Sequence, residues 1–158
     1  MRAVHAIPLA VAAFSVSCSE IPPPVDARVH LREGAGVDVP FSVTATGTYD
    51  IQLQYPKDRI PQHFKHKPFD RLTGSATLRA GDKKLAWQLP TGWFRLSPFD
   101  STAFGMVLVR FHAYASMSYV LTLHIGRLPE ELKDLQGVVS VYKVSPHFHP
   151  GHHVYELQ

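Results

Sequence analysis

The stretch that decides the fold is Phe104–Ile125, which reads FGMVLVRFHAYASMSYVLTLHI. Apolar residues alternate with other residues in its first part, and the alternation resumes at Tyr119. A period of two is typical of half-buried antiparallel strands. The pattern therefore predicts a hairpin of two strands joined by a three-residue loop at 116–118. The expected cross-strand pairs are Phe111 with Leu123 and Arg110 with His124.

Shorter alternating segments surround this stretch. They are residues 28–32, 37–44, 48–55, 75–79, 84–89, 93–96, 138–144 and 154–157. In 48–55 one face is apolar, and Asp50, Gln52 and Gln54 are expected to face water. Because Pro40 has no amide hydrogen, the strand that contains it is expected at a sheet edge or at a bulge.

The spacing of these segments predicts the fold class. About eight to ten short strands with turn signals between them are typical of an all-β, antiparallel β-sandwich of the immunoglobulin-like type. A closed barrel is the alternative. Residues 128–137 begin with Pro and acidic residues and end with Gly, which predicts one short helix in a late connection.

The N-terminus has the pattern of an exported protein. Arg2 precedes the apolar run 3–14 and small residues, which predicts a signal peptide over residues 1–17. The apolar run is shorter than the about 20 residues that a membrane span needs. The only cysteine, Cys18, follows directly and stands where a lipobox cysteine would be diacylated. Cleavage at the same bond without lipid attachment is the alternative.

A proline spacer follows the cysteine. Three consecutive prolines within residues 18–26 predict an extended tether, and a single β-sandwich domain is expected over residues 27–158. This order resembles that of small bacterial outer-envelope lipoproteins of unknown function, which have an anchor cysteine, a spacer and one immunoglobulin-like sandwich. The resemblance implies lipid attachment at Cys18 in the outer membrane, facing the periplasm. A soluble periplasmic protein is the alternative.

Composition narrows the function classes. The chain has 158 residues, 45% of them apolar, which is enough for one domain with a core. The net charge of +3 falls to +2 without residues 1–17, which is too small to argue for nucleic acid. The sequence contains no G-x-S-x-G, H-E-x-x-H or C-x-x-C motif, so we expect no enzyme and no organic cofactor.

A histidine-rich turn is the first candidate site. In the segment 147–153, which reads HFHPGHH, Pro150-Gly151 favours a turn that would bring flanking histidines together. Neutral imidazole is a good ligand for zinc and for copper. The candidate metal ligands are His147, His149 and His152. A solvent-exposed polar turn is the alternative.

A basic segment is the second candidate site. Residues 56–71 hold five cations and two anions, with apolar side chains among them. Such a surface would dock on lipid headgroups or on an acidic partner protein. The candidate partner-binding residues are Lys57, Arg59, Phe64, Lys65, Lys67, Phe69 and Arg71. A solvated loop whose aromatic rings pack back onto the sandwich is the alternative.

These observations favour a non-enzymatic binding module of the bacterial envelope. Its partner would be an envelope protein, or a toxin that the chain neutralises as an immunity-type inhibitor. Metal binding through the histidine-rich turn is a hypothesis of a different class.

Overall fold

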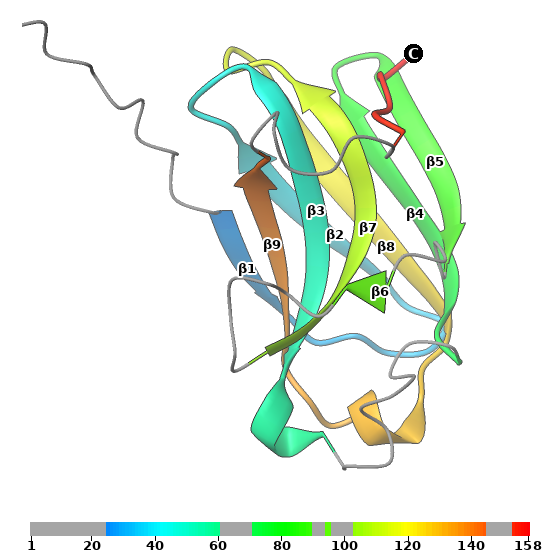
Figure 1. Cartoon of the computed structure of the whole chain (residues 1–158). Coiled ribbons are helices and arrows are strands. Elements are labelled where there is room, and N and C mark those ends of the chain that lie inside the picture. The colour runs from blue at the N-terminus through cyan, green and yellow to red at the C-terminus, as the bar shows by residue number, and fades with distance from the viewer. Residues whose placement is uncertain (1–24, 61–70, 90–93, 96–102, 145–152) are drawn as a thin grey trace, which may run out of the picture.

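Alternating segments of the chain pair into two antiparallel sheets that pack face to face (Figure 1). The computed structural model describes residues 25–60, 71–89, 94–95, 103–144 and 153–158. Within them, the five-stranded sheet has the order β1 (Val25–Val29), β9 (Gly137–Lys143), β3 (Gly47–Pro56), β7 (Ala103–Ala113), β6 (Phe94–Arg95). The four-stranded sheet has the order β2 (Gly36–Ser42), β8 (Ser118–Arg127), β4 (Thr73–Ala80), β5 (Lys83–Leu89). The predicted all-β antiparallel sandwich is confirmed.

The order of the strands is that of a jelly roll. Along most of the described chain, consecutive strands alternate between the two sheets, and only β4–β5 and β6–β7 are neighbours in both sequence and sheet. In an immunoglobulin sandwich the first two strands share a sheet, whereas here β1 and β2 are in different sheets. The immunoglobulin-like detail of the prediction therefore does not describe this topology. Periodicity indicates which face of a strand is buried, but it does not indicate which sheet the strand joins.

The predicted hairpin between the two strands of the fold-deciding stretch is wrong. Phe111 of β7 pairs with Tyr49 of β3, and Leu123 of β8 pairs with residues of β2 and β4. Residues 114–117 carry the chain from one sheet to the other. Phe111 and Tyr119 then meet across the core, with ring centroids 5.6 Å apart. Two strands with apolar faces bury them equally well as neighbours in one sheet or as members of two sheets that face each other. The alternation is therefore compatible with both arrangements.

Aromatic rings fill the space between the sheets near this crossing. Phe41 of β2 stacks on Tyr119 of β8, with centroids 5.3 Å apart and an interplanar angle of 15°. Phe111 lies edge-on to Phe41 at 6.4 Å and tilted against Tyr49 at 6.5 Å. All four side chains are buried, and such ring pairs stabilise a core beyond the area that they bury.

One local prediction is confirmed and two differ. Pro40 lies in β2, which is an edge strand. The expected helix over 128–137 is reduced to the single 3-10 turn η3 (Glu130–Leu132). Its residue Leu132 is buried in the core, and a single turn is enough to place that side chain there. β1 begins at Val25, two residues before the expected start of the domain.

Two glycines allow close approach of neighbouring groups. The pairing of β4 with β8 shifts register at Gly74, whose φ is +157°. A Cβ atom there would collide with the backbone carbonyl oxygen of His124. At Gly105 of β7, a Cβ atom would lie 3.1 Å from the side-chain Cδ and Oε1 of Gln52. Both positions therefore depend on the missing side chain.

Candidate functional site

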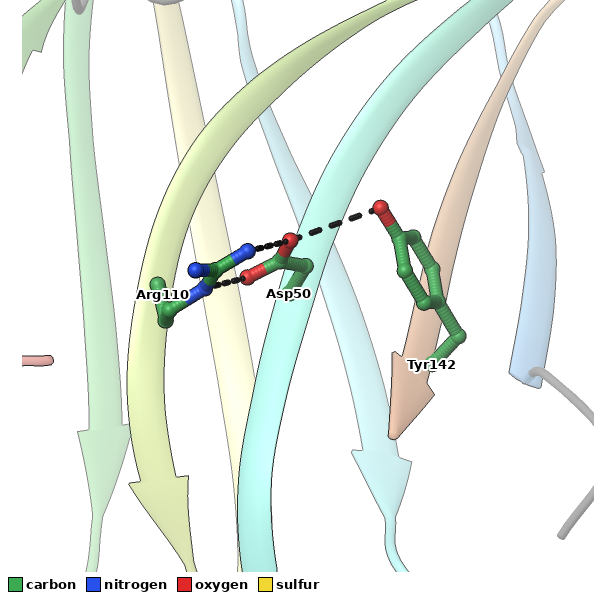
Figure 2. A network of polar contacts seen from close by, with 3 residues as sticks. All are labelled: Asp50, Arg110 and Tyr142. Carbon is green, nitrogen blue, oxygen red and sulfur yellow. Dashed lines mark hydrogen bonds and ion pairs between the residues drawn. The ribbon is translucent and has the colours of Figure 1, made fainter. Parts of the chain in front are cut away.

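An ion pair lies on the outer face of the five-stranded sheet (Figure 2). Asp50 of β3 and Arg110 of β7 are direct cross-strand partners. Arg110 Nε donates to Asp50 Oδ1 at 2.6 Å, and Arg110 Nη2 donates to Oδ2 at 2.8 Å. The two side chains are only 4% and 10% exposed. Hydrogen bonding to Asp50 raises the pKa of Arg110, against the opposing effect of burial, so the guanidinium stays charged.

Aromatic side chains flank the ion pair. Tyr142 of β9 lies on the other side of Asp50 and donates from its hydroxyl to Oδ2 at 3.4 Å (Figure 2). His112 follows Arg110 on the same face of β7, two residues along the strand. Its ring meets that of Tyr114 edge-on, with centroids 5.0 Å apart, and Tyr114 is 45% exposed. We call Asp50, Arg110, His112, Tyr114 and Tyr142 the recognition face.

A buried amide continues this face toward the other end of the sheet. Gln52 is fully buried, and its Oε1 accepts a hydrogen bond from Gln54 Nε2 at 2.7 Å. Its own Nε2 has no hydrogen-bond partner among the described residues. The side chain lies against Gly105, and β7 carries one extra residue, Leu108, opposite the step from Ile51 to Gln52. Bulges of this kind re-aim side chains, and they are common next to binding sites.

A second polar pair borders Gln52 on the β9 side. Ser140, which is 5% exposed, is the cross-strand partner of Gln52 and donates from Oγ to Asp26 Oδ1 at 2.5 Å. The outer face of this sheet is therefore polar, but three of its polar residues are buried: Asp50, Gln52 and Ser140. This corrects the expectation that Asp50 and Gln52 face water.

Sequence reasoning missed this site for an identifiable reason. The alternation predicts His124 as the cross-strand partner of Arg110, whereas its side chain binds Asp50, 60 residues away in sequence. The signal was present as one acid and one base on the polar faces of two strongly alternating strands. It becomes visible only when β3 and β7 are known to be neighbours.

Three cations of the predicted basic segment lie among the described residues. Lys57 and Arg59 form the 3-10 turn η1 (Lys57–Arg59), and both are exposed. Lys57 Nζ lies 5.6 Å from the centroid of the Phe104 ring. Arg71 pairs with Glu131 of η3 at 2.7 Å. The charge of Arg71 is therefore paired with a carboxylate, whereas Lys57 contacts a neutral ring. Phe64, Lys65, Lys67 and Phe69 lie outside the described residues.

The other predicted site residues also lie outside the described part. They are His147, His149 and His152 of the metal site and Cys18 of the anchor. Within residues 25–60, 71–89, 103–144 and 153–158, no three His, Cys, Asp or Glu side chains are grouped closely enough to hold a metal ion. None of the helical turns in those ranges has the length and apolar character of a membrane span.

Two solved structures of low sequence identity are similar to this chain. The crystal structure of a protein from Sulfurospirillum deleyianum matches with a TM-score of 0.53 and 10% identity, covering 78% of this chain and 98% of its own. The P-domain of the Penaeus vannamei nodavirus matches with a TM-score of 0.31 and 9% identity, with the same coverage of 78% and 98%. The first likeness shows the fold alone, and the second is too weak to support an argument. No family model and no curated protein matches the chain.

The recognition face is suited to binding. Asp50 already accepts two hydrogen bonds from Arg110. Tyr and Arg side chains over a fixed polar network are typical of the centres of interfaces. The ion pair keeps the guanidinium in one orientation, so little side-chain entropy is lost when a ligand contacts it.

Proposed function

We propose that this chain is a non-enzymatic binding module of the bacterial envelope, held there through Cys18 and binding its partner through the recognition face. The observation that supports it most directly is the bidentate Asp50–Arg110 pair next to half-buried Tyr142, on a strand face that continues through His112 to exposed Tyr114. A buried ion pair is seldom the most stabilising choice for a sheet surface, because apolar residues of similar volume often do as well or better. Its presence is explained if the oriented guanidinium and carboxylate are used.

The unpartnered amide of Gln52 supports the same conclusion. A buried donor without an acceptor lowers stability by about 1–3 kcal/mol. A ligand that offers a carbonyl or hydroxyl oxygen to Nε2 would recover that free energy on binding. Because Gln52 is fully buried, this gain requires its side chain to turn outward on binding, whereas the contact area that is already exposed is aromatic.

The anchoring part of the proposal rests on the sequence. Residues 1–17 and Cys18 have the pattern of an exported lipoprotein, and the domain begins seven residues after the cysteine, at Val25. A spacer of that length extends at most about 23 Å, at roughly 3.3 Å per residue. The module would thus act close to the membrane surface.

Site-specific photo-crosslinking tests the recognition face. A benzoylphenylalanine residue replaces Tyr114 in one protein and His124 in a matched control, because His124 is also exposed, on the outer face of the other sheet. Irradiation of intact cells should crosslink one specific partner from position 114 and none from position 124. The purified partner should then bind Tyr114→Ala at least about tenfold more weakly than the wild type, as expected for a hot-spot aromatic.

Equal crosslinking from both positions, or none from position 114, would show that this face is not the recognition surface. The anchor is tested separately with radiolabelled palmitate. Wild-type protein should be labelled and found in the membrane fraction, and Cys18→Ala should be unlabelled and soluble. If Cys18→Ala remains membrane-bound, the tether is not attached at this residue.

A further inference from the structure

The C-terminal residues 153–158 contact both sheets at their open edge (Figure 1). Tyr155 forms a parallel bridge with Phe111 of β7. Its N–H donates to the carbonyl of Arg110 at 2.9 Å, and its carbonyl accepts from the N–H of His112 at 3.0 Å. The segment therefore occupies the free edge of β7, beyond the short stretch that pairs with β6.

The end of the same segment pairs with the other sheet. Lys84 of β5 donates from its N–H to the carbonyl of Gln158 at 2.9 Å, and Gln158 donates back to the carbonyl of Lys84 at 3.4 Å. Since β5 is the edge strand of the four-stranded sheet, six residues join the edge of one sheet to the edge of the other. Without them, backbone groups at both edges would be unpaired.

Side-chain contacts hold this segment only weakly. Val154 is 39% exposed and Tyr155 is 43% exposed, and the ring of Tyr155 contacts His153 of the same segment at 4.5 Å. Within 153–158, only Leu157 is counted among the apolar residues that pack against the core. The bridge is also parallel, whereas every pairing among the described strands is antiparallel. The segment is thus attached mainly through its backbone.

We propose that the edge formed by β7 and β5 is a binding site for an extended polypeptide strand, and that the chain's own residues 153–158 occupy it exchangeably. The groups at this edge are backbone N–H and carbonyl groups at strand spacing, which recognise another main chain rather than a sugar or a lipid. The partner strand runs parallel to β7 and places an aliphatic side chain where Leu157 packs. This site uses the backbone groups of Arg110 and His112, whereas the recognition face uses their side chains, so the two sites adjoin and each has its own test.

A labelled peptide of residues 153–158, HVYELQ, is the probe. In the full-length Tyr155→Pro variant the N–H that donates to Arg110 is removed, so the chain's own segment is released more often. The peptide should bind this variant saturably, and at least tenfold more tightly than it binds the wild type, in fluorescence anisotropy. The matched control is the same peptide methylated on the backbone nitrogen of Tyr155, which should not bind. Equal binding of both peptides, or binding of neither, would overturn the proposal.

Hydrogen exchange on the unmodified chain gives a second test that does not depend on the variant folding. The amides of Tyr155, His112 and Lys84 should exchange together, at least 100-fold faster than the amide of Ile51 in the centre of β3. Exchange of all four at one rate would mean that the segment opens only when the whole domain unfolds, and the proposal would fail. If the wild type forms concentration-dependent dimers and the peptide does not bind, the edge is an interface between two copies of this chain, and the proposal of a partner strand is wrong.

Discussion

The Asp50–Arg110 pair allows a quantitative test of how the outer face of the five-stranded sheet is built. Replacing one member leaves the other charge nearly buried, with 4% or 10% of its side chain exposed and two hydrogen bonds lost. Breaking a buried pair in this way typically costs about 3–5 kcal/mol. We therefore expect Asp50→Ala and Arg110→Met each to lower the free energy of unfolding by about that amount.

The double variant distinguishes this explanation from a simple loss of packing. When both charges are removed, no unpaired charge remains, and apolar replacements of a buried pair are often neutral. Asp50→Ala with Arg110→Met should therefore be no less stable than either single variant, which gives a coupling energy of about 3–5 kcal/mol in a double-mutant cycle.

Urea unfolding followed by circular dichroism measures the effect. With a slope of about 2 kcal/mol per molar urea, each single substitution should lower the midpoint by about 2 M, without changing the slope. Tyr142→Phe is the matched control, since its hydroxyl is 3.4 Å from the carboxylate and the change should cost less than about 1 kcal/mol. If the losses of the two single variants add in the double variant, Asp50 and Arg110 are not energetically coupled, and the explanation by an unpaired charge is wrong.

Three further predictions concern packing. Gly74→Ala should lower the free energy of unfolding by more than about 3 kcal/mol, because the backbone is at φ +157° and a Cβ atom would collide with a backbone carbonyl of β8. The control Gly36→Ala should be near neutral, because the nearest atom to its added Cβ is 4.0 Å away. Equal melting temperatures of the two variants would refute this. Gly105→Ala should cost about 1–3 kcal/mol by displacing the Gln52 amide, and adding Gln52→Ala should recover part of that loss, as a thermal melt would show. Phe111→Ala should lower the free energy of unfolding by about 3–5 kcal/mol, measured by urea unfolding. A loss below about 1 kcal/mol would mean that the aromatic cluster is not central to the core.

The sequence predicted the local structure well, because local structure follows from periodicity. The alternation of Tyr49, Ile51, Leu53 and Tyr55 located β3, and all four residues are buried. The missing amide of Pro40 placed its strand at an edge, which the topology confirms. These inferences need only the geometry of one strand or one turn.

The candidate site was not predictable in the same way. The partner of Arg110 is fixed by which strands lie side by side, and β3 and β7 are separated by more than 45 residues. The burial of Gln52 depends on Gly105 lacking a side chain on the neighbouring strand, which no local pattern expresses. Sequence reasoning directed attention to clusters that are contiguous in the chain, whereas the jelly roll brings together residues that are distant in it.

The position of β9 between β1 and β3 also determines when the five-stranded sheet can form during synthesis of the chain. Among the described strands β1 is synthesised first, yet its neighbour in the sheet is the last of them, so this pairing cannot form until residues 137–143 exist. Topologies dominated by such distant pairings fold slowly. The five-stranded sheet can therefore close only after residues 137–143 have been synthesised, whereas all strands of the four-stranded sheet are complete by residue 127.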